Sequence, residues 1–286
     1  MRIKALLIIC ILLTGLLCGC QQEPAAQVAA TTLPVYQFTQ RLCQGTGITV
    51  TRLVTESVSC LHDYALNVSQ VRAAEAAEVV VISGMGLEDF MDDILVGKAT
   101  IDSSAGIEGA HSEHHHEGHH HEEDSHIWLA PENAKIMAAN ICSGLCQRFP
   151  GHADTFQKNL TALLADLDAL QSYAREALAE LSCRELITFH DGFTYLAEAF
   201  DLTIVKAIEE ESGAEASAQE LIALVELVQD HNLPAIFVET NGSGSAADII
   251  AAETNTRVYT LDMAMAGDDY FESMYRNINT LKEALG

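Results

Sequence analysis

The stretch ADTFQKNLTALLADLDALQSYAREALAEL, residues 153–181, places apolar residues at helical spacing and contains neither Gly nor Pro. We interpret it as one long helix, and we place the whole linker at residues 153–182. At 1.5 Å per residue such a helix is roughly 40 Å long. The sequence on both sides of it alternates between strand and helix patterns. The chain is therefore predicted to contain two α/β domains joined by a long rigid helix.

Short β-branched runs that end in turn signals predict the strands of both domains. Helical patterns separate these runs, and that alternation is typical of parallel-type sheets. We place the first domain at residues 31–152 and the second at residues 183–286. The predicted strands are residues 48–54 and 78–84 before the long helix, and 185–190, 202–208, 235–240 and 257–262 after it.

Two helix starts carry recognisable signals. Pro131 suits the first turn of a helix that continues to Pro150. Ser217 and Glu220 have the spacing of a capping box at the start of another helix. These signals support the α/β pattern on both sides of the linker.

The N-terminus has the pattern of an export signal. Arg2 and Lys4 precede an apolar run, residues 5–18, which is shorter than the roughly 20 residues that a membrane helix needs. We interpret residues 1–19 as a signal peptide. The sequence Leu17-Cys18-Gly19-Cys20 resembles a bacterial lipobox, which implies cleavage before Cys20, lipidation of its thiol and a tether over residues 21–30. The alternative is an ordinary secretory signal with a chance cysteine. The predicted protein is exported and lipid-anchored to the outer face of the cytoplasmic membrane.

The formal net charge of −26 makes nucleic acid an improbable partner and favours the accumulation of cations. A strongly acidic chain can also be merely a soluble one. We expect a monomer. Beyond the signal and lipobox there is an odd number of cysteines without a CxxC pair, so their pairing cannot be read from the sequence. They are Cys43, Cys60, Cys142, Cys146 and Cys183.

A run rich in histidine and acids, HSEHHHEGHHHEEDS, occupies residues 111–125. It is internal and interrupted, unlike a purification tag. Imidazoles and carboxylates at this density attract divalent metals, but a run without apolar residues cannot build a packed cage. We interpret it as a flexible loop that collects metal weakly beside a tighter site, with a merely solvated loop as the alternative. The accessory candidates are His111, His114, His115, His116, His119, His120 and His121.

Metal-binding side chains also recur where predicted strands end. In open α/β sheets, ligands bind beyond the carboxyl ends of the strands. Three histidines and a carboxylate would form a four-coordinate set that suits Zn²⁺ better than Mn²⁺. Each residue also has a plain structural alternative, as a core histidine or a helix-capping aspartate. The predicted ligands are His62, His126, His190 and Asp262, with Glu239 as an accessory candidate.

Several segments carry a family resemblance. CLHDYALNVSQVRAAEAAEVVVISGMGLEDFMDDIL, DSHIWLAPENAKIMAANI, FHDGFTYLAEAFDLTIV and AIFVETNGSG with RVYTLD resemble the zinc- and manganese-binding lipoproteins of bacterial ABC importers, the cluster A-I solute-binding proteins. The resemblance runs from about residue 31 to the C-terminus. It implies a metal held between two α/β domains by residues that match His62, His126, His190 and Asp262. Because the manganese branch usually has Glu at the position of His190, the resemblance favours zinc.

The chain departs from the family pattern beside these ligands. Cys60-Leu61 replaces a common Asp-Pro before His62, and Ser125 precedes His126. In the family, proline usually follows the two carboxylates that match Asp262 and Glu239. This chain has Met263 and Thr240 at those positions.

The leading functional hypothesis is a non-enzymatic, extracytoplasmic zinc receptor that delivers Zn²⁺ to an ABC permease and its ATPase. A secreted zinc hydrolase is the first alternative, since three histidines and a carboxylate can activate water. The sequence has no HExxH motif within a predicted helix and no GxSxG elbow. A manganese-binding, metal-storage or adhesin-type lipoprotein is the second alternative.

Overall fold

The computed structural model describes residues 26–56, 61, 64–109, 124–209, 217–240, 244–265 and 267–286. The predicted signal peptide, Cys20, Cys60, His62 and the seven accessory histidines of residues 111–121 lie outside the described residues. Among the helices that are described, none combines the length and the apolar character needed to cross a membrane.

The N-terminal lobe contains a four-stranded parallel sheet with strand order β2-β1-β3-β4. Its core strands are buried because they consist of small and β-branched residues such as VAA and VVVI. The strands are β1 (Val28–Ala30), β2 (Val50–Arg52), β3 (Val79–Ile82) and β4 (Thr100–Asp102). The helices of this lobe are α2 (Leu33–Leu42), α3 (Val68–Ala76), the 3-10 turn η1 (Asp89–Met91), α4 (Asp92–Leu95), the 3-10 turn η2 (Ile127–Leu129) and α5 (Pro131–Arg148).

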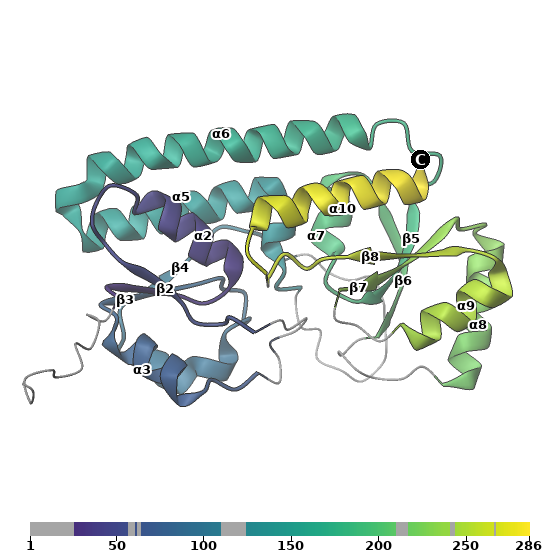
Figure 1. Ribbon diagram of the computed structural model, residues 1–286, viewed down its shortest axis with the longest axis horizontal. Helices are drawn as coiled ribbons and strands as arrows, with labels where there is room; N and C mark the ends of the chain where they lie inside the picture. Colours follow the sequence, from purple (N-terminus) through teal and green to yellow (C-terminus); the bar gives the residue numbers. More distant parts are fainter. Residues whose placement is uncertain are drawn as a thin grey trace, which may run out of the picture.

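The C-terminal lobe repeats this arrangement with a parallel sheet of strand order β6-β5-β7-β8. Figure 1 shows the two sheets at opposite ends of the molecule. The strands are β5 (Glu185–His190), β6 (Thr203–Glu209), β7 (Ala235–Glu239) and β8 (Arg257–Leu261). The helices are α7 (Thr194–Ala199), α8 (Ala218–Asp230), α9 (Ser245–Thr254) and α10 (Tyr270–Leu285).

The linker helix α6 (Ala153–Ala177) follows the short 3-10 turn η3 (Pro150–His152) and runs along one side of both lobes (Figure 1). It packs against α5 and α10. Its buried side chains recur every three to four residues, as one face of a helix requires, and include Phe156, Leu163, Leu167, Leu170 and Ala174. The predicted long helix is confirmed, although it ends at Ala177 and not at residue 181.

The other predicted elements are also confirmed within a few residues at their ends. Six strands lie where the β-branched runs predict them, a helix begins at Pro131, and Ser217 and Glu220 form a complete capping box at α8. The predicted tether, residues 21–30, is wrong at its end, because residues 28–30 form the fully buried strand β1 inside the first sheet. Strand β4 was likewise not predicted.

The two lobes are joined by more than α6. The segment after β8 crosses to the N-terminal lobe, where Leu33 N donates to Met265 O at 3.3 Å and Arg52 Nη1 donates to Gly267 O at 2.7 Å. At the start of α10, the Tyr270 ring lies 5.1 Å from the Phe38 ring, edge to face. These contacts hold the segment after β8 and the start of α10 against the first lobe.

Candidate metal centre

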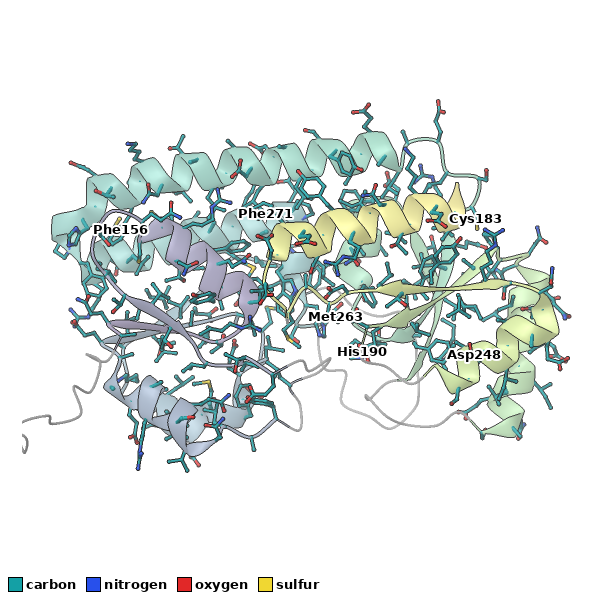
Figure 2. All side chains as sticks on the ribbon, in the orientation of Figure 1. Phe156, Cys183, His190, Asp248, Met263 and Phe271 are labelled. Atoms are coloured by element: carbon teal, nitrogen blue, oxygen red, sulfur yellow. The ribbon has the colours of Figure 1, made fainter. Side chains whose placement is uncertain are left out.

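The structure brings together two of the predicted ligands, one from each lobe. His190 is the last residue of β5, and His126 immediately precedes η2. Each is only 3% exposed. The centroids of the two imidazole rings are 5.3 Å apart and the ring planes are nearly perpendicular, at 88°. Figure 2 shows His190 beside Met263 at the centre of the molecule, where the two lobes meet.

His126 is fixed in this position by the hydrophobic segment that follows it. Ile127, Trp128 and Leu129 are fully buried. Trp128 Nε1 donates to Met263 O at 2.7 Å, and Trp128 O accepts from the Tyr270 hydroxyl at 2.7 Å. Both hydrogen bonds cross from the N-terminal lobe to the C-terminal lobe and hold Trp128 in place. Because His126 is only two residues before Trp128, its position is held as well.

Gly192 allows the two rings to come this close. A Cβ atom at this position would lie 2.7 Å from His190 Cδ2, 2.7 Å from Met263 Cε and 2.8 Å from His126 Nδ1. Real Cβ atoms essentially never make contacts this short. Any larger residue at 192 would therefore force at least one of the histidines to move.

Asp124 is a functional residue that the sequence pattern did not reveal. Its Oδ1 atom accepts from His126 Nδ1 at 2.9 Å and from His126 N at 2.8 Å, and its Oδ2 atom accepts from Thr194 N at 3.3 Å. Burial of the carboxyl opposes ionisation, but these hydrogen bonds outweigh it and hold the pKa of Asp124 below its usual value. Residues 124 and 125 were expected to belong to the His-rich loop, but Asp124 binds His126 and Ser125 is buried.

The nitrogen of His126 that faces away from Asp124 is available to a ligand. His126 Nε2 is buried and has no hydrogen-bond partner among the described residues. A buried polar atom without a partner is costly in an apolar site. Neutral imidazole nitrogen is also a preferred zinc ligand, and its other nitrogen usually donates to a carboxylate. The pair formed by Asp124 and His126 therefore fits a bound transition metal.

Glu239 lies at the same edge of the second sheet as His190. Thr188 of β5 is paired with Phe237 of β7, so His190 and Glu239, each two residues later, end neighbouring parallel strands. Glu239 is 4% exposed. This placement makes Glu239 a candidate for an oxygen ligand next to the histidines.

Asp262 follows β8 directly, but its carboxylate is bound to other groups. Oδ1 accepts from Ala264 N at 2.8 Å and Oδ2 accepts from Ser273 Oγ at 2.9 Å. Arg276 Nη1 lies 3.6 Å from the same Oδ2 atom. In the described part of the chain, no three His, Cys, Asp or Glu side chains form a metal-holding group. Asp262 as a ligand stays a prediction, and so does His62, which is not among the described residues.

The residues on either side of His62 are anchored. Leu61 is fully buried and its carbonyl accepts from Tyr64 N at 3.0 Å. The Tyr64 hydroxyl donates to Glu56 Oε2 at 2.6 Å, and Gln70 Nε2 donates to both Glu56 and the Tyr64 oxygen. The ends of the segment that carries His62 are therefore tied to each other and to α3.

The four cysteines that the structure describes are free thiols. Cys43 and Cys142 are buried, and burial raises the pKa of each thiol to about 12. Cys146 and Cys183 are partly buried. None of the four belongs to a metal-holding group within the described ranges.

Comparisons with known proteins identify the family of this chain. A family model described as zinc-uptake complex component A, periplasmic (ZnuA), matches residues 28–284. The zinc-binding lipoprotein AdcA of Streptococcus pneumoniae serotype 4 is 28% identical over 285 residues, which cover 92% of this chain but 56% of AdcA. This chain thus spans about half the length of AdcA.

Two solved structures of ZnuA have the same fold. The first superposes with a TM-score of 0.80 at 29% identity and covers 91% of this chain and 100% of that chain. The second, a zinc-bound deletion mutant of ZnuA, superposes with a TM-score of 0.77 at 29% identity and covers 91% and 98% of the two chains. Since the family model matches nearly the whole sequence and the two-lobed fold agrees, the chain belongs to the ZnuA family of metal-binding, non-enzymatic solute-binding proteins, which serve ABC transporters outside the cytoplasm.

Proposed function

We propose that this protein is a high-affinity Zn²⁺ receptor that delivers its ion to an ABC permease driven by a cytoplasmic ATPase. The single observation that carries the proposal is the pairing of His126 and His190 from opposite lobes, with His126 Nε2 buried and without a hydrogen-bond partner among the described residues. His62 supplies the third imidazole, and Asp262 or Glu239 supplies an oxygen. Lipidation of Cys20 keeps the receptor at the outer face of the cytoplasmic membrane, beside the permease.

The geometry accounts for both capture and release of the ion. A metal held by His126 and His190 bridges the two lobes, so every bound ion adds a link between them. Release then requires that the two histidines separate or take up protons, because a protonated imidazole cannot coordinate a metal.

Zinc is favoured over manganese by the donor set. Imidazole nitrogens suit Zn²⁺, whereas carboxylate, carbonyl and water oxygens suit Mn²⁺. The described pair consists of two imidazoles, and His190 stands where manganese-binding relatives usually have Glu. The zinc-binding lipoprotein AdcA is also among the relatives of this chain.

The hydrolase alternative is wrong, because the ZnuA family consists of transport receptors without enzymatic activity. The His-rich segment before Asp124 acts as a weak collector that raises the local concentration of Zn²⁺ near the tight site. Its position supports this role, because Asp124, directly after it, binds a predicted ligand.

Competition titration tests the proposal. The mature protein is titrated calorimetrically with Zn²⁺, with Mn²⁺, and with Zn²⁺ in the presence of excess Mn²⁺. We expect one tight Zn²⁺ event that excess Mn²⁺ does not suppress. If Mn²⁺ displaces Zn²⁺ from the tight site at comparable concentrations, the protein is a manganese receptor; if neither ion binds tightly, the receptor proposal itself fails.

A further inference from the structure

One buried carboxylate touches both lobes beside the paired histidines. The Asp124 side chain is only 4% exposed. Its Oδ1 atom accepts two hydrogen bonds from His126, and its Oδ2 atom accepts one from Thr194 N, the first backbone amide of α7. His190 ends the strand that leads into α7. A single side chain thus contacts one predicted ligand and the element that follows the other.

The hydrogen bond to Asp124 decides which nitrogen of His126 carries the proton. An ionised carboxylate can only accept hydrogen bonds, so His126 Nδ1 must be the donor. In the neutral ring the lone pair then lies on Nε2. That atom is the buried one without a partner in the described chain. The ring is therefore held in the tautomer and orientation that offer Nε2 to a metal.

A second hydrogen bond joins the same region to α7. The Tyr195 hydroxyl donates to Glu108 O at 3.3 Å, and Tyr195 is 4% exposed. Glu108 lies shortly before the His-rich segment and Asp124 directly after it. The first two residues of α7 therefore bind the chain on both sides of this segment.

We propose that Asp124 is a positioning residue for metal capture: it presents His126 Nε2 to the ion and ties that ligand to α7 of the opposite lobe. The inference rests on the proposed function as a metal receptor. The hydrogen bonds of Asp124 join protein groups alone, so its orienting role can be tested on the protein without metal.

The first test uses the mature protein without metal. Long-range ¹H–¹⁵N correlation spectra at pH 8 report the tautomer of each histidine ring, and the His126 signals are assigned as those lost in His126→Asn. We expect wild-type His126 to carry its proton on Nδ1, and Asp124→Ala to shift a substantial fraction to Nε2. The Thr194 amide should also exchange its proton faster in Asp124→Ala. A proton on Nε2 in the wild-type protein would overturn the inference without any variant.

The second test measures zinc affinity. Loss of a hydrogen-bond partner behind a metal ligand typically weakens binding about 10- to 100-fold, and we expect that range for Asp124→Ala. Asp124→Asn keeps the size and an acceptor for Nδ1, so it should be intermediate. Asp102 is a matched control, because it also accepts two hydrogen bonds from the residue two positions later. Its Oδ1 atom accepts from Ser104 N at 2.8 Å and from Ser104 Oγ at 2.7 Å.

Asp102→Ala should leave the tautomer of His126 and the zinc affinity unchanged. Unchanged affinity in Asp124→Ala, with tight binding in the wild-type protein, would overturn the positioning role. If the wild-type protein itself fails to bind zinc tightly, the proposed function fails, and the tautomer spectra still decide the orienting role of Asp124.

Discussion

The imidazole rings of His126 and His190 lie 5.3 Å apart and almost perpendicular to each other, although one ring belongs to the segment before η2 and the other ends β5 in the opposite lobe. Two features of the surrounding chain hold them there. Trp128 buries the segment behind His126, and Gly192 leaves room between the rings. A shared ion is the simplest chemical reason for placing two imidazoles face to edge in a buried site.

Removal of any one of the predicted histidine ligands should weaken tight zinc binding strongly. Structural zinc sites gain about 10–16 kcal/mol from roughly four ligands, so one ligand is worth on the order of 3 kcal/mol, or about 100-fold in affinity. We expect His126→Ala and His190→Ala, and also His62→Ala, to weaken binding by about that factor in isothermal titration. His231→Ala is the control, because that histidine pairs with Glu185 at the surface. Wild-type affinity in any of the three variants removes that residue from the site.

Gly192→Ala tests the close approach of the two rings. The added Cβ atom would lie within 2.8 Å of atoms in both histidines, so at least one of the two rings must move. We expect zinc affinity to fall at least about 10-fold while the protein stays folded, since only a local shift is needed. Gly244→Ala is the matched control, because a Cβ atom there meets nothing within 4 Å. Equal affinities in the two variants would show that the space at residue 192 is not required.

Glu88 gives the N-terminal lobe a pH-dependent stability. Burial raises the pKa of its carboxyl from 4.5 to about 7, although Thr31 Oγ1, Ser83 N and Gly84 N all donate to it. The folded protein therefore holds this proton more tightly than the unfolded chain. The resulting stabilisation is complete below about pH 4.5 and is lost as the pH rises to about 7.

The measurement compares the wild-type protein with Glu88→Gln, which cannot titrate. The free energy of unfolding of the wild-type protein relative to the variant should fall by on the order of 2 kcal/mol between pH 5 and pH 8, as followed by chemical denaturation without metal. A difference between wild type and Glu88→Gln that is the same at both pH values would contradict the raised pKa.

Deletion of the His-rich segment should separate weak from tight sites. The deletion removes residues 111–123 and stops before Asp124, because Asp124 binds His126 and must be kept. Equilibrium dialysis at neutral pH should find several zinc ions on the full-length mature protein and about one on the shortened protein, with unchanged affinity for that one. Equal stoichiometry would mean that the segment collects no metal, and loss of the tight ion would place the primary site within it.

The fold was largely predictable from periodicity. The apolar residues of 153–181 recur at the spacing of the buried side chains of α6. The β-branched runs that lead to His190, Glu239 and Asp262 form strands whose ends meet at one edge of the second sheet. Strands β1 and β4 were not found in this way, because β4 reads as Thr-Ile-Asp, with a single apolar residue, and β1 contains only one β-branched residue. β1 reads as Val-Ala-Ala directly after a polar stretch, and its burial depends on pairing with both β2 and β3.

The site was predictable only in its ligand types. His126 and His190 could be proposed from their places at element ends, but Asp124 stands in an acidic run, EEDS, where nothing distinguishes one carboxylate from the next. Its role follows from the turn that brings its oxygen to the His126 ring. Gly192 similarly reads as an ordinary turn glycine. Its function follows only from the close approach of His126 and His190, which leaves no room for a Cβ atom at residue 192.

The central claim is that one zinc ion is held between the two lobes by imidazoles from both. Anomalous diffraction at the zinc absorption edge, from crystals of the mature protein grown with equimolar Zn²⁺, tests this claim most directly. The account predicts that the strongest anomalous peak lies about 2.0–2.1 Å from His126 Nε2 and at a similar distance from a ring nitrogen of His190. A strongest peak elsewhere, with the His126 and His190 nitrogens bound to water or protein groups, would contradict it.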